Sequence, residues 1–98
     1  MEYSVLPSRF FLDQLEHLSE ASKRLLEEKI RLIKINPYRN KRVQGYGLFL
    51  FRIRFENERK EKRAVYLVDK PFVKMLCILD RNNDYKELKN YLKLLGYL

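Results

Sequence analysis

A hydrophobic period of two dominates the second half of the chain. In LFLFRIRF, residues 48–55, the odd-numbered positions are all apolar, whereas the positions between them change from leucine to Arg52 and Arg54. Because successive side chains of a strand point to opposite faces, the two arginines share one face. A turn at residues 57–61 is expected to lead to a second β-prone run, RAVYLV at 63–68, and a further short turn leads to a third, FVKMLCIL at 72–79. Three consecutive strands with short connections predict an antiparallel meander.

The first half of the chain carries a helical period instead. After the short β-prone stretch EYSVL, apolar residues recur at spacings of four and three, and Ser8 is suited to cap the first helix at its N-terminus. A second helix is predicted to begin near Ser19 and to end around Asn36, just before Pro37. Together these two segments predict a helical hairpin.

The remaining segments complete a small α+β domain. The polar tract PYRNKRVQGYG, residues 37–47, is interpreted as a loop, and residues 84–98 place Leu88, Leu92 and Leu95 on one helical stripe. The expected order is β-α-α-β-β-β-α, with the helical hairpin packed on one face of a small twisted, mainly antiparallel sheet and with a C-terminal helix. A chain of 98 residues fits one domain, residues 1–98.

The opposite face of the sheet is then expected to meet water or a partner. The terminal helix is amphipathic, so two roles stay open for it: docking on the sheet or giving way to a partner's helix.

Positive charge is concentrated in the middle of the sequence. The formal net charge is +8, and residues 38–63 hold nine basic residues against three acidic ones. Such a face attracts polyanions, of which nucleic acid is the most common, although an acidic protein or an anionic membrane surface would respond to the same field.

Composition excludes several other classes of function. One cysteine cannot form an internal disulfide, and one cysteine with one histidine cannot build a usual zinc site. Cys77 lies among apolar residues and is expected to be a small buried hydrophobe. No segment approaches the length of a membrane span and no signal pattern begins the chain, so a cytoplasmic protein without a membrane partner is predicted.

Arginines from three predicted strands are expected to meet on one surface. Arg52 and Arg54 share a face of the first meander strand, Arg63 begins the second, and Arg81 directly follows the third. A guanidinium group suits phosphate because its planar fork donates two parallel hydrogen bonds and stays charged.

Each of these residues also has a purely structural interpretation. The two arginines of the first strand are consistent with an ordinary solvated face. Arg63 is equally suited to pair across the strands with Glu56 or Glu58. Arg81 and Tyr85 are suited to cap and pack the last helix.

The ordered runs FRIRF, KRAVYLV and MLCILDRNNDY resemble the RelE/ParE toxin superfamily, specifically the RelE-like messenger-RNA interferases of toxin–antitoxin pairs. The resemblance covers nearly the whole chain. It implies a site formed by a basic pair on the first meander strand, an arginine that opens the next strand, an arginine just after the third and a tyrosine a few residues on. These positions are Arg52, Arg54, Arg63, Arg81 and Tyr85.

The resemblance implies a metal-independent endoribonuclease that cleaves messenger RNA on the ribosome. The RNA 2′-hydroxyl attacks the scissile phosphate, Arg54 and Arg63 hold that phosphate, Arg81 acts on the leaving group, and Tyr85 orients the substrate or activates the hydroxyl. Further RNA contacts are expected from Arg52, Lys41, Arg42 and Lys62.

The implied partners are a cognate acidic antitoxin similar to RelB, the ribosome and messenger RNA, with no cofactor. Two alternatives stay open: a ParE-like toxin that inhibits DNA gyrase, and an RNA-binding domain without catalysis.

Overall fold

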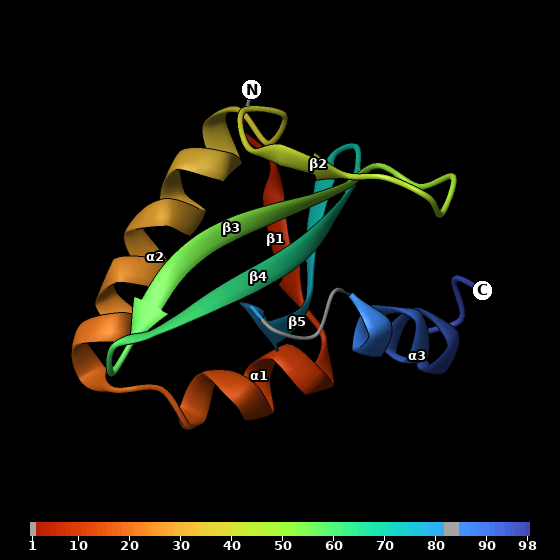
Figure 1. The fold of residues 1–98 in the computed structure, drawn as a ribbon. Coiled ribbons are helices and arrows are strands. Elements are labelled where there is room, and N and C mark those ends of the chain that lie inside the picture. The colour runs from red at the N-terminus through yellow and green to blue at the C-terminus, as the bar shows by residue number, and fades with distance from the viewer. Residues whose placement is uncertain (1, 82–84) are drawn as a thin grey trace.

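Figure 1 shows a curved sheet with helices on both of its faces. The computed structural model describes residues 2–81 and 85–98. Its elements run in the order β1 (Ser4–Pro7), α1 (Arg9–Glu16), α2 (Glu20–Ile35), β2 (Lys41–Val43), β3 (Leu50–Asn57), β4 (Lys60–Asp69), β5 (Phe72–Asp80) and α3 (Lys86–Leu94). The strand order in the sheet is β1-β5-β4-β3-β2. Only β1 and β5 run parallel, so the predicted α+β class with a mainly antiparallel sheet is confirmed.

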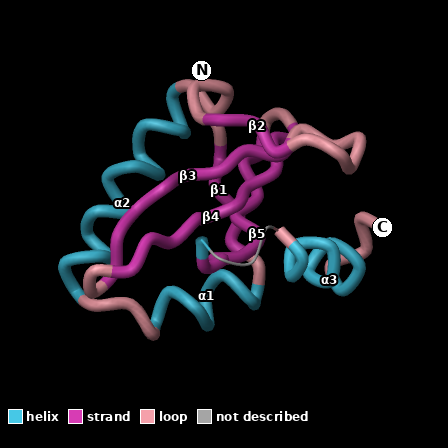
Figure 2. Tube along the Cα trace, viewed as in Figure 1, coloured by secondary structure: helices cyan, strands magenta, loops and turns pink. Residues whose placement is uncertain are grey.

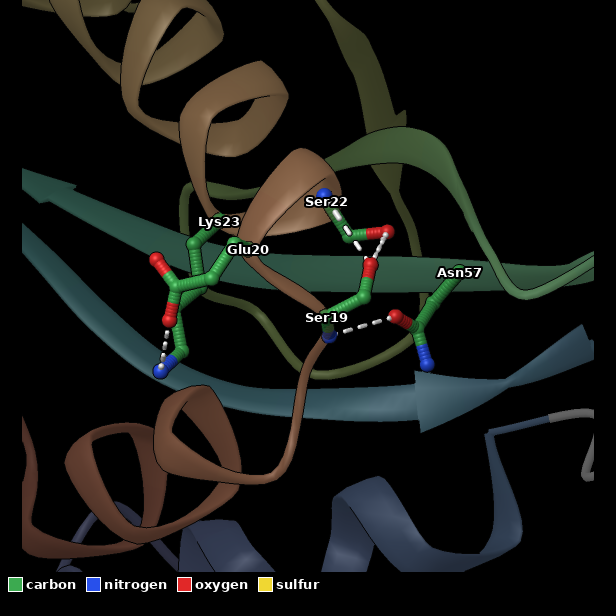
Figure 3. A network of polar contacts seen from close by, with 5 residues as sticks. All are labelled: Ser19, Glu20, Ser22, Lys23 and Asn57. Carbon is green, nitrogen blue, oxygen red and sulfur yellow. Dashed lines mark hydrogen bonds and ion pairs between the residues drawn. The ribbon is translucent and has the colours of Figure 1, made fainter.

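Serine caps begin both helices of the hairpin: the cap at Ser8 and a second helix starting near Ser19 were predicted, and the structure adds that Ser19 is itself a cap. The Ser8 hydroxyl accepts a hydrogen bond from the Phe11 backbone N–H, and the Ser19 hydroxyl accepts one from Ser22. Each bond satisfies one of the free N–H groups at a helix start. Figure 3 shows that the Ser19 backbone N–H also donates to Asn57 Oδ1, at 3.0 Å. The start of α2 is therefore fixed to the end of β3.

The meander has tighter turns than the sequence suggested. Residues 57–61 were expected to form the first turn, but β3 extends to Asn57 and β4 begins at Lys60, so only Glu58 and Arg59 connect them. Both residues have positive φ, 50° and 70°. Two consecutive left-handed residues match the twist of a two-residue hairpin. This turn fixes the register in which Arg54 lies opposite Arg63.

One strand was missed by the sequence analysis. The tract 37–47, interpreted as a loop, contains β2, which pairs antiparallel with the first three residues of β3. Three residues are too few for a period of two to be recognised, and Lys41 and Arg42 gave this edge strand a polar composition. Only Val43 of β2 is buried.

The helical hairpin covers one face of the sheet. Leu26 and Ile33 of α2 are fully buried there, in a core that includes Phe51, Ile53 and Phe55 of β3. In Figure 2, α2 lies at the left beside β3, and α1 lies below, next to β5. The alternating aromatic residues of β3 therefore point away from Arg52 and Arg54.

The C-terminal helix covers part of the other face. Leu88 and Leu92 of α3 are fully buried in a second core with Val65 and Leu79 of the sheet. The expectation that this face would meet water or a partner is therefore wrong for the area under α3. In this structure the leucine stripe docks on the sheet, which was one of the two roles left open for it.

Side chains of α1 complete the free edge of β5. β1 pairs with β5 only as far as Met75, and beyond it Gln14 replaces a neighbouring strand. Gln14 Oε1 accepts from the Ile78 backbone N–H at 2.6 Å, and its Nε2 donates to Ile78 O at 2.9 Å and to the Tyr91 hydroxyl at 3.0 Å. One glutamine therefore joins α1, β5 and α3. Its contact on β5, Ile78, lies three residues before Arg81. Within residues 2–81 and 85–98, no helix is long and apolar enough to cross a membrane.

Candidate functional site

The strand register brings the predicted arginines to one face. Arg52 and Arg54 lie on β3, and Arg63 of β4 lies directly opposite Arg54. Arg81 follows the end of β5, and Tyr85 precedes α3. Tyr85 packs against the α3-side core. We refer to these five side chains, together with Glu61, described below, as the arginine cluster.

Tyr85 connects two of the strand arginines. Its hydroxyl accepts a hydrogen bond from Arg52 Nη1 at 2.7 Å, and the Arg63 guanidinium lies 5.3 Å from the centre of its ring. The ring face attracts the cation, and the hydroxyl oxygen fixes the other arginine. The Tyr85 backbone is left-handed, with φ 63°, and its side chain does not cap α3. An unfavourable backbone conformation thus accompanies a side chain that points toward the arginines.

Glu61 bridges the other two arginines. Its Oε1 accepts from Arg54 Nε at 3.1 Å and from Arg54 Nη2 at 2.6 Å. Its Oε2 lies 3.2 Å from Arg81 Nε, close enough for an ion pair, although the two atoms lack the alignment of a hydrogen bond. The hydrogen bonds from Arg54, followed by the positive charges of Arg54, Arg81 and Arg63, lower the pKa of Glu61 against the opposing effect of desolvation. The carboxylate is therefore ionised at neutral pH.

The sequence analysis assigned Glu61 to a turn and gave it no role. It had considered Glu56 and Glu58 as partners of Arg63, but in the structure the bridging acid is Glu61, and it contacts Arg54 and Arg81 instead. The available signal was parity, because Glu61 and Arg63 are two residues apart and must share a face of a strand.

Two arginines of the cluster have donors without partners. The Nε atoms of Arg52 and Arg63 are shielded from solvent and have no hydrogen-bond acceptor among the residues that the structure describes. Arg54 and Arg81 keep 56% and 66% of their side-chain surface exposed. Shielded donors beside exposed cations are the arrangement expected where an anion binds, since an acceptor brought by a ligand would satisfy them.

Lys41 extends this face toward the sheet edge. It pairs in register with Arg52, which places both side chains on the same side of the sheet. Both residues line an open cavity of about 370 Å³, whose wall also includes Arg39 and Arg54. The positive surface therefore continues from the arginine cluster across β3 to β2.

Arg42 and Lys62, predicted as RNA contacts, lie on the other side. Arg42 pairs in register with Phe51, and its guanidinium lies 4.8 Å from the centre of the Phe49 ring. Lys62 pairs in register with Phe55 and forms an ion pair with Asp80. The structure thus brings together Arg52, Arg54, Arg63, Arg81, Tyr85 and Lys41 and separates the other two residues from them.

The remaining ionisable groups offer little other chemistry. Asp80, the acid next to Arg81, points to the opposite face with Lys62. Burial raises the pKa of the Cys77 thiol to about 12, so this group is protonated and unreactive at neutral pH. Across residues 2–81 and 85–98, no group of three potential metal ligands gathers. The described side chains are thus arranged to bind and polarise an anion through guanidinium groups and a tyrosine hydroxyl.

Comparisons with known proteins identify the fold. The sequence matches no protein-family model and no curated protein. Among solved structures, a double mutant of the free E. coli toxin RelE is similar over 98% of this chain and 99% of that one, with a TM-score of 0.79 and 15% identity. The E. coli RelBE toxin–antitoxin complex matches over 83% and 99% of the two chains, with a TM-score of 0.70 and 18% identity.

An archaeal relative has the same architecture. The RelE–RelB complex of Pyrococcus horikoshii matches 85% of this chain and 99% of that one, with a TM-score of 0.65 and 21% identity. The chain therefore has the fold of the RelE toxins, and the predicted resemblance is confirmed at the level of the fold.

Proposed function

We propose that this protein is the toxin of a toxin–antitoxin pair and acts as a metal-independent endoribonuclease on messenger RNA at the ribosome. The observation that carries the proposal is a group of four arginines on one face, from β3, β4 and the position after β5. Tyr85 joins Arg52 with Arg63, and Glu61 joins Arg54 with Arg81. A fold alone supports many functions, so the proposal depends on this cluster.

RNA supplies the nucleophile for such a reaction. The 2′-hydroxyl loses its proton to water as its oxygen forms a bond to the adjacent phosphorus. The bond from phosphorus to the 5′-oxygen breaks, and this oxygen takes up a proton from water, so the products end in a 2′,3′-cyclic phosphate and a 5′-hydroxyl. Two negative charges develop on the phosphate oxygens in the transition state. Guanidinium groups stay protonated at neutral pH, so they accelerate the step chiefly by stabilising this charge.

The positions in the cluster suggest a separate role for each residue. Arg54 and Arg63 lie opposite each other on neighbouring strands and hold the scissile phosphate. Arg81 has a long side chain that is 66% exposed, and it reaches the leaving oxygen. Tyr85 presents its ring and hydroxyl beside Arg63 and Arg52, where it orients the nucleotide that carries the attacking hydroxyl.

An antitoxin partner is part of the same proposal. Two of the similar structures are complexes of RelE with RelB. A chain with a net charge of +8 and an exposed arginine cluster suits an acidic partner that covers this face and keeps RNA away from it.

The test is cleavage of ribosome-bound messages in a cell-free translation system, mapped by primer extension. The wild-type protein is expected to produce cuts at defined codon positions. Arg81→Ala should lower the cleavage rate by about 100-fold, the cost of removing one donor to a transition-state oxyanion. RNA affinity should fall less than about tenfold, because one phosphate contact among several is lost.

Arg31→Ala is the matched control, since Arg31 is an exposed arginine on α2, on the face opposite the cluster. It should leave the cleavage rate within about twofold of wild type, as surface substitutions away from a site do. Intact messages together with inhibited DNA supercoiling would instead indicate a gyrase inhibitor. Equal cleavage by the Arg81→Ala and Arg31→Ala proteins would contradict the role given to Arg81.

A further inference from the structure

Among the described residues, Glu61 is the one acidic member of the arginine cluster. Its two carboxylate oxygens face different arginines, Arg54 on one side and Arg81 on the other. An acid among residues that would bind a phosphate lowers the local positive potential, so its presence needs a physical reason.

We propose that Glu61 is a positioning residue for RNA cleavage, which holds Arg54 and Arg81 at the separation that places their remaining donors on one phosphate. This inference rests on the proposed endoribonuclease function and assigns a role to a residue outside the predicted site. Glu61 itself contacts neither substrate nor reacting atoms.

The bonding pattern leaves the phosphate-binding donors free. A guanidinium group has five N–H donors. Arg54 directs Nε and Nη2 to Glu61, and its Nη1 has no partner among the residues that the structure describes. Arg81 directs only Nε to Glu61, and neither of its terminal nitrogens bonds to a described residue. Both side chains are more than half exposed. Glu61 thus contacts the Nε of each arginine and leaves terminal N–H groups of both guanidinium groups to a ligand.

Without Glu61, nothing in the described structure would hold the side chains of Arg54 and Arg81 together. Arg54 and Arg63 are like charges directly opposite each other across two strands, an arrangement that drives side chains apart. Arg81 lies beyond the end of β5, and its ion pair with Glu61 is its one charged contact with the other described residues of the cluster. Glu61 belongs to the paired part of β4, opposite Glu56, so its own position is fixed by the sheet.

A competing interpretation makes the carboxylate a substitute for the phosphate. In that case Glu61 would occupy the ligand's place and its removal would accelerate cleavage. The two interpretations therefore predict changes of opposite sign in the cleavage rate.

The experiment compares Glu61→Gln with wild type in single-turnover cleavage of ribosome-bound message, together with RNA affinity. Glutamine keeps one carbonyl oxygen for Arg54 but presents an amide to Arg81, so one of the two arginines is released. Affinity should stay equal or increase slightly, because the net charge rises by one. The cleavage rate should fall about tenfold, because misplacing one catalytic group costs this much or more.

Glu56→Gln is the matched control. It makes the same change in charge on the same face of the sheet, directly opposite Glu61, at a side chain that has no hydrogen bond or ion pair with the described residues. Its cleavage rate should stay within about twofold of wild type. Circular dichroism and the thermal midpoint establish that both variants are folded.

The outcomes separate this inference from the proposed function. A lower cleavage rate together with equal or higher RNA affinity in Glu61→Gln supports the positioning role. Faster cleavage by Glu61→Gln, or a rate equal to that of Glu56→Gln, would overturn it while leaving the nuclease in place. Failure of the wild-type protein to cleave would instead refute the proposed function.

Discussion

Substitution of Gln14 by methionine tests how the end of β5 is held. Gln14 is half-buried and makes three hydrogen bonds, two to the backbone of Ile78 and one to the Tyr91 hydroxyl. Methionine has nearly the same length and shape but can make none of them. The change therefore isolates the polar contacts, while the packing between α1 and β5 is largely preserved.

The cost follows from the groups that lose partners. An unsatisfied polar group costs about 1–3 kcal/mol when water cannot reach it, and the two groups of Ile78 are only partly accessible beneath α1. We expect a total loss in the free energy of unfolding of about 2 kcal/mol. For a domain of this size, each kcal/mol lowers Tm by about 4–8 °C, so a decrease of roughly 8–16 °C is predicted.

Thermal unfolding followed by circular dichroism measures this decrease, and hydrogen exchange at Ile78 locates it. The matched control is Gln44→Met, at an exposed loop position, which should leave Tm within about 2 °C of wild type. If Gln14→Met shifts Tm no more than the control and Ile78 exchanges at its original rate, water replaces the glutamine without cost. The inference that Gln14 substitutes for a missing strand would then be wrong.

Two further stability predictions follow from single side chains. Tyr66→Phe should lower the free energy of unfolding by about 1–3 kcal/mol in urea titration, because the fully buried Tyr66 hydroxyl donates to Pro37 O and accepts from Asn40; an unchanged urea midpoint would contradict this. The pKa of Glu61 is lower in the folded protein than its usual value of about 4.3, so its stabilisation is complete above that pH and is lost as the pH falls through the folded-state pKa. The decrease in Tm caused by Glu61→Gln should therefore be larger at pH 7 than at about pH 3, and a decrease that is the same at both values would refute the ionised bridge.

Local signals were sufficient for most of the fold. Ser8 and Ser19 have side chains that satisfy the first N–H groups of a helix, so both helix starts could be predicted from neighbouring residues alone. The period of two in β3 likewise placed Arg52 and Arg54 on one face. The short strand β2 escaped because three residues carry too little pattern to be distinguished from a loop.

Strand alternation already separates two of the predicted RNA contacts from the arginine cluster. Lys62 neighbours Arg63 in one strand, and Arg42 neighbours Lys41 in another, so alternation already directs each pair to opposite faces. Basic composition had been counted over the whole segment without regard to this parity. The structure adds that Lys62 pairs with Asp80, which removes that acid from the surroundings of Arg81.

The sequence by itself determined most of the strands and helices and which side of β3 carries the arginines, because these depend on spacings of two to four residues along the chain. Only the tertiary structure decided how the strands align. The two-residue turn at Glu58 and Arg59 sets Arg54 opposite Arg63 and brings Glu61 beside Arg54, and a slip of one residue would turn every side chain of β4 to the other face. The docking of α3 also depends on contacts between elements distant in sequence, such as α3 with β5, whose free energy no local pattern contains.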